Sequence, residues 1–385
     1  MRPTARVPAR RRLLATVLAA CLAALGLALA PPQQATVHAA ARASEGVLLV
    51  DNGDPAKRIT LVLLGDGYTA AELPRYRTEA ATVWQALTAV EPFRTYQHLF
   101  DVRRVDVVSA RSGLRAGSPL GMHFGCEGIA RLLCADADAV SRRAGGSGGP
   151  QYLIALANSS AYGGEGGDAT TTLAAGSPDA ARILQHEMGH TVGGLGDEYD
   201  SAPGAPAEHA PGYPNLGSAD EATMREQRQK WWRWLGATDP SGGAVGAYLS
   251  ANGLYRPTRD SIMRTLGGVY NLPSREAIIE SIYRQVGPVD RVDPAPGTAD
   301  GRPMLRVRPV QLVGPRRIEV TWQVDGRPAP AAAVGEDSLD TARLELTPGQ
   351  WTLVCATVRD TTPWLRDESF RAARMTSTVS WSLHG

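Results

Sequence analysis

The sequence has 385 residues, of which 43% are hydrophobic, and its formal net charge is +1 at pH 7. This length allows two domains, and the composition is that of a folded globular protein rather than a disordered one. Residues 1–43 hold six of the 40 basic residues and no acidic residue, so the remaining chain has a formal charge of −5. A chain with this negative balance is not expected to bind nucleic acid.

Residues 1–43 are predicted to be a cleaved export signal. Three consecutive arginines precede an apolar run that ends near Ala30, and small residues at about 40–44 offer cleavage sites. We therefore expect a secreted protein that has no membrane span after processing. The arginines also suit twin-arginine export, and Cys21 suits either a lipid anchor or an ordinary position within the apolar run.

The next part of the chain alternates between strand and helix patterns. Strands are expected at residues 58–64, 100–109 and 151–159. Thr69 and Glu72 have the capping-box spacing that opens a helix, which here continues to about Val90. Residues 128–134 are expected to be helical, and the glycine-rich residues 162–176 to form a loop and an edge strand. This alternation predicts an α/β (mixed α+β) fold.

Three cysteines follow the predicted export signal, and disulfides persist outside the cell. Cys126 and Cys134 are close enough in sequence to form a short disulfide loop, with free thiols as the alternative. Cys355 is expected to be a buried thiol in a strand.

A well-bounded helix of about fifteen residues is predicted after residue 176. Ser177 suits the N-cap, Pro178 the first helical position, and Gly193–Gly194 the C-terminal end. A last helix at 273–285 is expected to begin at a Ser274 cap. Both helices precede a change in composition along the chain.

The change in composition occurs at residues 286–303, which are rich in proline, glycine and aspartate. Beyond them every pattern is a short strand, including two strands within 342–360 joined at Pro348–Gly349. The predicted organisation is a mixed α/β domain at 44–288, a linker at 289–302, and a small β-sandwich at 303–385.

His186, Glu187 and His190 lie within one turn of the predicted helix. Residues four apart share a helix face, so the two imidazoles can bind one zinc ion with Glu187 beside them. Zinc lowers the pKa of a bound water to about 7, and Glu187 can take the proton of that water as a carbonyl is attacked. The spacing predicts metal-assisted amide hydrolysis. The alternative is a solvated helix face that binds no metal.

The residues after the helix are expected to supply a third metal ligand. Gly193–Gly194 allows the chain to turn back toward the metal, and Gly196 has no side chain. Asp197 is the nearest carboxylate and the preferred ligand, with Glu198 and then Asp200 as alternatives. A carboxylate that does not bind metal would orient an imidazole or cap the loop.

Several short motifs follow one another over about residues 50–285. They are GDGYT (65–69), EPF (91–93), FGCEGIARLLC (124–134), NSSAYGGEGG (158–167), HEMGHTVGGLGDEY (186–199) and YRPTRDSIMR (255–264). Together they resemble the secreted bacterial metallopeptidases of the IgA peptidase type. The C-terminal β-domain is similar to the immunoglobulin-like module found in members of that family.

The resemblance implies a zinc endopeptidase with a zincin fold of the metzincin type. It implies that His186 and His190 bind the metal, that Glu187 is the catalytic base, and that Asp197 is the matching third ligand. Metzincins also place a methionine turn beneath the metal, and Met263 occurs in a turn context downstream, although it also suits an ordinary core position. Specificity does not follow from the resemblance.

The glycine-rich segment offers a place for a substrate. Tyr162, Gly163 and Gly164 belong to a predicted edge strand that can pair with an extended peptide through backbone hydrogen bonds. Tyr162 then lines the cleft or lies in a surface loop, and Tyr199 donates to an oxyanion or packs beneath its loop. We therefore expect a protein or peptide substrate and a monomeric enzyme.

Two other functions fit the same residues. One is a protein that binds the cell surface or wall and contains a structural zinc site, and the other is a zinc amidase that trims wall peptides. A purely structural site does not require Glu187 or an open coordination position, which favours the peptidase.

Overall fold

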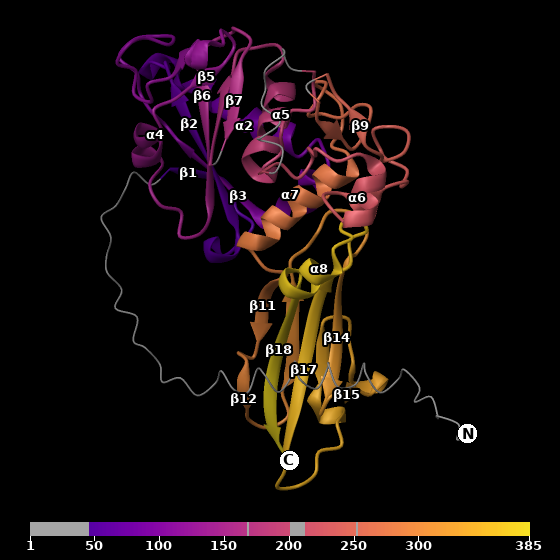
Figure 1. Ribbon diagram of the computed structural model, residues 1–385. Coiled ribbons are helices and arrows are strands. Elements are labelled where there is room, and N and C mark those ends of the chain that lie inside the picture. The colour runs from indigo at the N-terminus through magenta and orange to yellow at the C-terminus, as the bar shows by residue number, and fades with distance from the viewer. Residues whose placement is uncertain (1–45, 168, 201–211, 252) are drawn as a thin grey trace, which may run out of the picture.

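The computed structural model describes residues 46–167, 169–200, 212–251 and 253–385. The predicted export signal, including Cys21, lies outside the described residues. An upper part contains most of the helices and a broad sheet, and a lower part consists mainly of long strands (Figure 1). Within the described ranges, no helix is long and apolar enough to cross a membrane.

The upper part is built on a six-stranded mixed sheet with the order β1-β3-β2-β6-β8-β7. Its four central strands are parallel, and the two outermost strands, β1 and β7, run antiparallel to their neighbours. The strands are β1 (Val47–Val50), β2 (Ile59–Asp66), β3 (Phe100–Val105), β6 (Gln151–Ala157), β7 (Gly164–Gly167) and β8 (Thr170–Ala174). The predicted mixed α+β fold is confirmed.

Helices cover both faces of this sheet, which is why every residue of β2 is buried (Figure 1). Leu61 and Leu63 pack with residues of α2 and α5 in one cluster, whereas Val62 and Leu64 pack with α4 in a second cluster. This alternation follows from the two-residue period of a strand. The helices are α2 (Leu73–Leu87), α3 (Phe93–Tyr96), α4 (Ala137–Ala144), α5 (Ala180–Gly193), α6 (Glu221–Gln227) and α7 (Leu272–Gln285).

The predicted helix caps are confirmed in part. The backbone N–H of Thr69 donates to the Glu72 carboxylate at 3.0 Å, as a capping box requires, before α2 begins. The expected cap at Ser274 is wrong, because α7 begins earlier and Asn271 caps it by accepting from the Ser274 N–H. Helix α5 also begins later than expected, at Ala180 rather than at Pro178.

Residues 128–134, expected to be helical, instead form a tight loop that ends in the two-residue strand β5 (Leu133–Cys134). This strand pairs with β4 (His123–Phe124). A disulfide joins Cys126 and Cys134 with a Cα–Cα distance of 6.2 Å. Eight residues of helix would separate the same atoms by about 12 Å, so a disulfide and a helix are incompatible here. Two further short strands, β9 (Tyr248–Leu249) and β10 (Tyr255–Arg256), pair with each other.

The lower part contains a three-stranded sheet, β11-β13-β16, and a five-stranded sheet, β12-β18-β17-β14-β15. Apolar side chains of both sheets share one cluster, in which the rings of Trp322 and Trp381 stack at 5.7 Å. The elements are β11 (Val289–Asp293), β12 (Gly297–Ala299), β13 (Met304–Pro309), β14 (Ile318–Val324), β15 (Arg327–Pro328), β16 (Ser338–Asp340), β17 (Trp351–Asp360), α8 (Glu368–Arg374) and β18 (Thr376–His384).

Two expectations for the C-terminal region need correction. Residues 289–302, expected to be a linker, contain β11 and β12, which pair with β13 and β18 and so add strands to the lower sheets. Residues 342–360 contain one strand rather than two, because Asp340 accepts from the Ala342 N–H and starts a 3-10 turn at Thr341–Arg343. Cys355 is a buried thiol in β17, as expected.

A fully buried carboxylate joins the two parts. Asp360, at the end of β17, accepts hydrogen bonds at 2.8 Å from the hydroxyls of Tyr96 in α3 and Tyr283 in α7. Its other oxygen accepts from the Thr362 N–H, also at 2.8 Å. Both oxygens therefore have donors, and we call this group the Asp360 hub.

Candidate metal centre

Helix α5 presents His186 and His190 on one face, because the two residues are four apart. The helix ends at Gly194, whose φ of +59° is in the left-handed region that glycine adopts without strain. His186 and Glu187 are buried, with 8% of each residue's surface exposed. The helix and its terminal glycine therefore place the motif inside the upper part rather than on a solvated surface.

Two backbone carbonyls hold the imidazoles. Nδ1 of His186 lies 3.0 Å from the carbonyl oxygen of Ile262, and Nδ1 of His190 lies 2.6 Å from that of Leu195. A carbonyl can only accept, so each Nδ1 carries the proton and each Nε2 keeps a lone pair. The two Nε2 atoms lie 3.2 Å apart and point at the same place.

Asp197 completes this group. Its Oδ1 lies 3.0 Å from Nε2 of His186 and 3.3 Å from Nε2 of His190. The atom is buried, and no hydrogen-bond donor reaches it among the residues that the structure describes. Three lone pairs converge without a proton between them, which is unfavourable unless a cation lies there. The donor set of two imidazoles and one carboxylate is the kind that binds a transition metal.

The pKa shifts of Asp197 and His190 also favour a positive charge between these three side chains. Burial alone would raise the pKa of Asp197, but the two nearby imidazoles outweigh burial and hold that pKa far below its usual range. Burial opposes a charged His190, yet Asp197 and Glu187 raise the pKa of His190 to about 9. In the absence of a metal ion, a proton on His190 would supply the missing charge.

Glu187 lies beside the two imidazoles. One carboxylate oxygen lies within 4.8 Å of a ring nitrogen of each histidine. Burial raises the pKa of Glu187, an effect that the charges of His186 and His190 partly offset. A buried carboxylate with a raised pKa next to a group of metal ligands is suited to accept and return a proton.

The loop after α5 directs the adjacent carboxylates of Asp197 and Glu198 to different places. Both backbone polar groups of Gly196 hydrogen-bond the side chain of Asn215, and a Cβ at this position would collide with Leu216 and Tyr213. This anchored turn directs Asp197 to the imidazoles. It directs Glu198 away from them, into the interior.

Glu198 is buried in a network of its own. Its carboxylate accepts from Asn215 at 2.9 Å, from Asn271 at 3.2 Å and from the Ser261 hydroxyl at 2.7 Å. Burial raises its pKa to about 7, against these hydrogen bonds. Asp200, the other alternative, forms an ion pair with Arg264 at 2.8 Å. Of the three carboxylates considered from the sequence, the structure brings Asp197 to the histidines.

The turn that contains Met263 lies beneath α5. Met263 is fully buried, and a Cβ on Gly189 of α5 would collide with its sulfur. The carbonyl of Met263 accepts from the Glu198 N–H at 2.9 Å, and the neighbouring carbonyl of Ile262 is the partner of His186. The turn therefore supports both the first histidine and the loop that carries Asp197.

A cleft of about 220 Å³ opens beside these residues. Its walls include the predicted substrate residues Tyr162, Gly163 and Gly164. Tyr162 is 48% exposed, and β7, which begins at Gly164, is the outermost strand of the sheet. The other lining residues are Arg131, Ile183, His186, Glu187, Tyr199, Arg264 and Leu266.

Tyr199 contacts two of the candidate metal ligands and also lines the cleft. Its hydroxyl donates to Oδ2 of Asp197 at 2.6 Å, and its ring stacks on that of His186 at a centroid distance of 6.5 Å. Burial and the charge of Asp197 raise the pKa of Tyr199 to about 12. In this arrangement the hydroxyl proton is used to orient Asp197.

Several residues of the site escaped sequence analysis. Asn215, Asn271 and Ser261 hold Glu198, and Arg131 and Arg264 line the cleft. These five residues are distant from α5 in sequence, and none stands in a spacing that indicates a site. Arg131 lies in the motif at 124–134, and Ser261 and Arg264 lie in the motif at 255–264, but neither motif indicates what these residues do.

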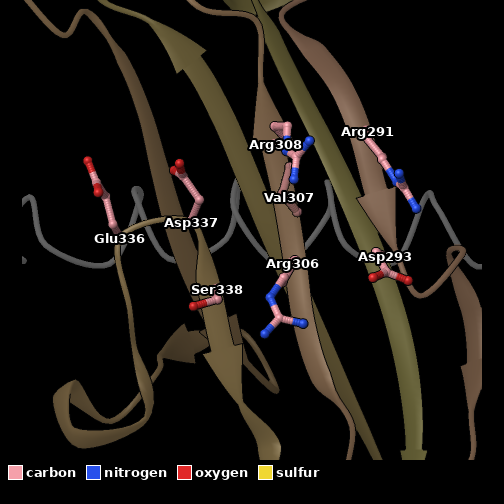
Figure 2. A pocket seen from close by; sticks show the side chains of 8 residues that line it. All are labelled: Arg291, Asp293, Arg306, Val307, Arg308, Glu336, Asp337 and Ser338. Atoms are coloured by element: carbon pink, nitrogen blue, oxygen red, sulfur yellow. The ribbon is translucent and has the colours of Figure 1, made fainter.

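A second hollow, of about 550 Å³, lies on the three-stranded lower sheet (Figure 2). Its lining side chains include Arg291, Arg306, Arg308, Asp293 and Glu336, which are spread over three separate segments of the chain. It contains no histidine, and its carboxylates are not gathered at one point (Figure 2). Of these two hollows, the cleft beside α5 therefore has the side chains that could hold a metal ion.

A family model described as IgA Peptidase M64 matches residues 47–242, just over half of the chain. The matched range includes β7, α5 and the loop with Asp197. No curated protein matches the chain.

Proposed function

The chain belongs to the IgA Peptidase M64 family, and we propose that it is a secreted, monomeric, zinc-dependent endopeptidase. Membership makes it a peptidase of a metallopeptidase family, with proteins or peptides as substrates. The observation that carries the finer proposal is the buried Oδ1 of Asp197, which faces two imidazole lone pairs and has no hydrogen-bond donor among the described residues.

The distances among the three ligand atoms support zinc. The separations between Nε2 of His186, Nε2 of His190 and Oδ1 of Asp197 are 3.2, 3.0 and 3.3 Å. The ligands of a tetrahedral zinc ion lie about 2.0–2.1 Å from the metal and therefore about 3.3 Å from one another. His186, His190 and Asp197 would hold the ion, and a fourth position would remain for water.

Glu187 is proposed to be the general base. Bound zinc would supply a water with a pKa near 7, together with a positive charge that polarises a peptide carbonyl. Glu187 would take the proton of that water and pass it to the leaving amine. Its burial suits both steps, because a raised pKa lets the carboxylate hold the proton between them.

Strand β7 is proposed to bind the substrate backbone. As the outermost strand it has N–H and C=O groups on one side that no strand within the described residues pairs. Gly164 and Gly166 allow this strand to lie against α5, because a Cβ on Gly164 would collide with Ile183 and a Cβ on Gly166 would collide with the carbonyl of Glu187. An extended peptide added to β7 would therefore run close to Glu187, with Tyr162 at the side of the cleft.

The remaining features support a zincin fold of the metzincin type and export of the protein from the cell. Met263 would be the methionine turn beneath the metal, and the C-terminal β-domain, which begins at β11, would be an immunoglobulin-like domain that follows a catalytic domain at 44–288. The disulfide between Cys126 and Cys134 suits an oxidising compartment outside the cell. Residues 1–43 would then be the cleaved signal.

Replacement of Glu187 tests the proposal. The Glu187→Ala variant should keep zinc, measured by elemental analysis, and lose casein or peptide cleavage by a factor of about 10²–10⁴, the usual contribution of a general base. The matched control is Glu226→Ala, which removes an exposed carboxylate on α6 and should keep activity. Full cleavage by Glu187→Ala would overturn the assignment. Hydrolysis of wall peptides but not of proteins would indicate an amidase instead.

A further inference from the structure

Arg131 places a positive charge in the wall of the cleft. Four charged or ionisable side chains in the cleft wall are Arg131, Arg264, His186 and Glu187. Arg264 is already used, because it donates to the carbonyl of Glu198 and pairs with Asp200 at 2.8 Å. Arg131 donates to the Tyr199 hydroxyl at 3.2 Å and forms no ion pair among the described residues. Its side chain is exposed.

The loop that carries Arg131 is held in place. The disulfide closes residues 126–134, and β5 at the end of the loop pairs with β4. The carbonyl of Arg131 packs against Gly163 so closely that a Cβ on Gly163 would collide with it. The guanidinium is therefore presented to the cleft by a fixed backbone, which reduces the entropy lost when it binds a ligand.

Arg131 is also close to the proposed reaction centre. Its guanidinium carbon lies 5.9 Å from the centroid of the Tyr199 ring, and that ring stacks on His186 at 6.5 Å. An extended peptide advances about 3.3 Å per residue, so the guanidinium is within reach of substrate residues two or three positions from the bond at Glu187. A guanidinium presents several donors in a planar fork that matches a carboxylate.

Two acids of this region, Glu165 and Glu127, lie outside the cleft wall. Glu165 follows Gly164 in β7, but its carboxylate contacts Sγ of Cys134 at 3.0 Å and does not line the cleft. Glu127 lies in the same loop and also does not line the cleft. The positive end of the cleft therefore faces the substrate.

We propose that Arg131 is a specificity-determining residue that selects peptides with a carboxylate two or three residues from the cleaved bond. The carboxylate is either an aspartate or glutamate side chain or the α-carboxylate of a chain terminus. The inference rests on the proposed peptidase function and names the substrate class of the same cleft.

Matched peptides test the inference. One pair has glutamate or glutamine at the varied position and an amidated C-terminus, and a second pair is neutral with a free or amidated C-terminus. The zinc-loaded wild type should show a kcat/KM about tenfold or more higher for the acidic member of one pair, as expected for a charge-assisted hydrogen bond. The pair that responds identifies the source of the carboxylate.

Substitution at Arg131 separates recognition from damage to the site. Arg131→Gln should bring the ratio for the responding pair close to one, and Arg131→Lys should restore part of it. Arg142→Gln, which changes an exposed arginine on α4, should leave the ratio unchanged. An equal loss of kcat/KM on both members of a pair, with their ratio kept, would overturn the inference and assign Arg131 to positioning of Tyr199.

Binding provides a readout that does not depend on turnover. The Glu187→Gln variant should bind the acidic peptide about tenfold more tightly than its neutral partner, and Arg131→Gln in that background should abolish the difference. Equal binding and equal cleavage of both peptides by proteins with Arg131 would overturn the inference while leaving the peptidase function intact. An acidic preference in binding without cleavage of any peptide would instead refute the peptidase function alone.

Discussion

The loop after α5 and the Asp360 hub both bury an aspartate, but they use its oxygens differently. At the hub, the hydroxyls of Tyr96 and Tyr283 and a backbone N–H satisfy both oxygens. In the loop, Tyr199 satisfies one oxygen of Asp197, and the other faces two lone pairs. Burial raises the pKa of Asp360, whereas the imidazoles lower that of Asp197 despite burial.

Whether the protein supplies donors to both oxygens distinguishes a structural carboxylate from one that is suited to bind a ligand. A buried carboxylate whose donors all come from the protein is complete and needs nothing further. A buried oxygen without a donor, next to other unprotonated atoms, is complete only when a cation is present. Glu198 provides an internal comparison, since it is adjacent to Asp197 and has donors for both oxygens.

The largest expected effect is on metal binding by Asp197. Asp197→Asn keeps the size of the side chain and removes the charge that faces the imidazoles. Changes in groups that only orient metal ligands cost about 10–100-fold in affinity, so loss of a ligand should cost more than about 100-fold. The zinc dissociation constant, measured by competition with a chelator, checks this.

Glu198→Gln is the matched control for that measurement. It removes a neighbouring buried carboxylate whose oxygens have protein donors, so zinc affinity should change far less than in Asp197→Asn. The opposite result, with zinc lost from Glu198→Gln and kept by Asp197→Asn, would reverse the roles assigned to the two residues.

A smaller effect, on stability, is expected at the hub. Asp360→Ala leaves two tyrosine hydroxyls and one backbone N–H without an acceptor, and each unsatisfied buried group costs about 1–3 kcal/mol. The free energy of unfolding should therefore fall by about 3 kcal/mol or more, as measured in urea. Zinc affinity of the folded protein should stay at the wild-type value. A variant as stable as the wild type would show that the hub contributes nothing.

The smallest expected effect concerns pH. Burial raises the pKa of Asp360 in the folded protein above 3.8, so its folded form binds a proton more tightly than the unfolded chain. The associated stability is fully present below pH 3.8 and is lost as the pH rises through the higher folded value. Asp360→Asn cannot titrate, so the difference in unfolding free energy between wild type and variant should change in this window by at most about 1.4 kcal/mol per pH unit. If the difference in unfolding free energy between the two proteins did not change with pH, the raised pKa of Asp360 would be contradicted.

The sequence predicts the candidate metal site on α5 because the features that indicate it are local. Three reactive residues with helical spacing and a glycine at the end of the helix are visible within about fifteen residues. The choice between Asp197 and Glu198 was not visible, because it depends on Asn215, which anchors Gly196 from a distant segment. The Glu198 network is equally non-local.

The wrong expectations have a related origin. Residues 128–134 have an apolar pattern that suits a helix, but the disulfide imposes a short loop. Ser274 is a good capping residue, yet Asn271 three positions earlier caps α7 and lets the helix begin sooner. The β11 and β12 strands have few apolar residues, because they lie at the edges of their sheets, and so their sequence has the composition of a linker.

Helix α7 connects the Asp360 hub to the loop that carries Asp197. Tyr283, near its last turn, is bonded to the Asp360 hub, and Asn271, its N-cap, donates to Glu198 in the loop that bears Asp197. Its 14 residues make a stiff rod about 21 Å long. If the C-terminal strands were fastened to a surface, a pull on them would reach the loop that carries Asp197 along this rod.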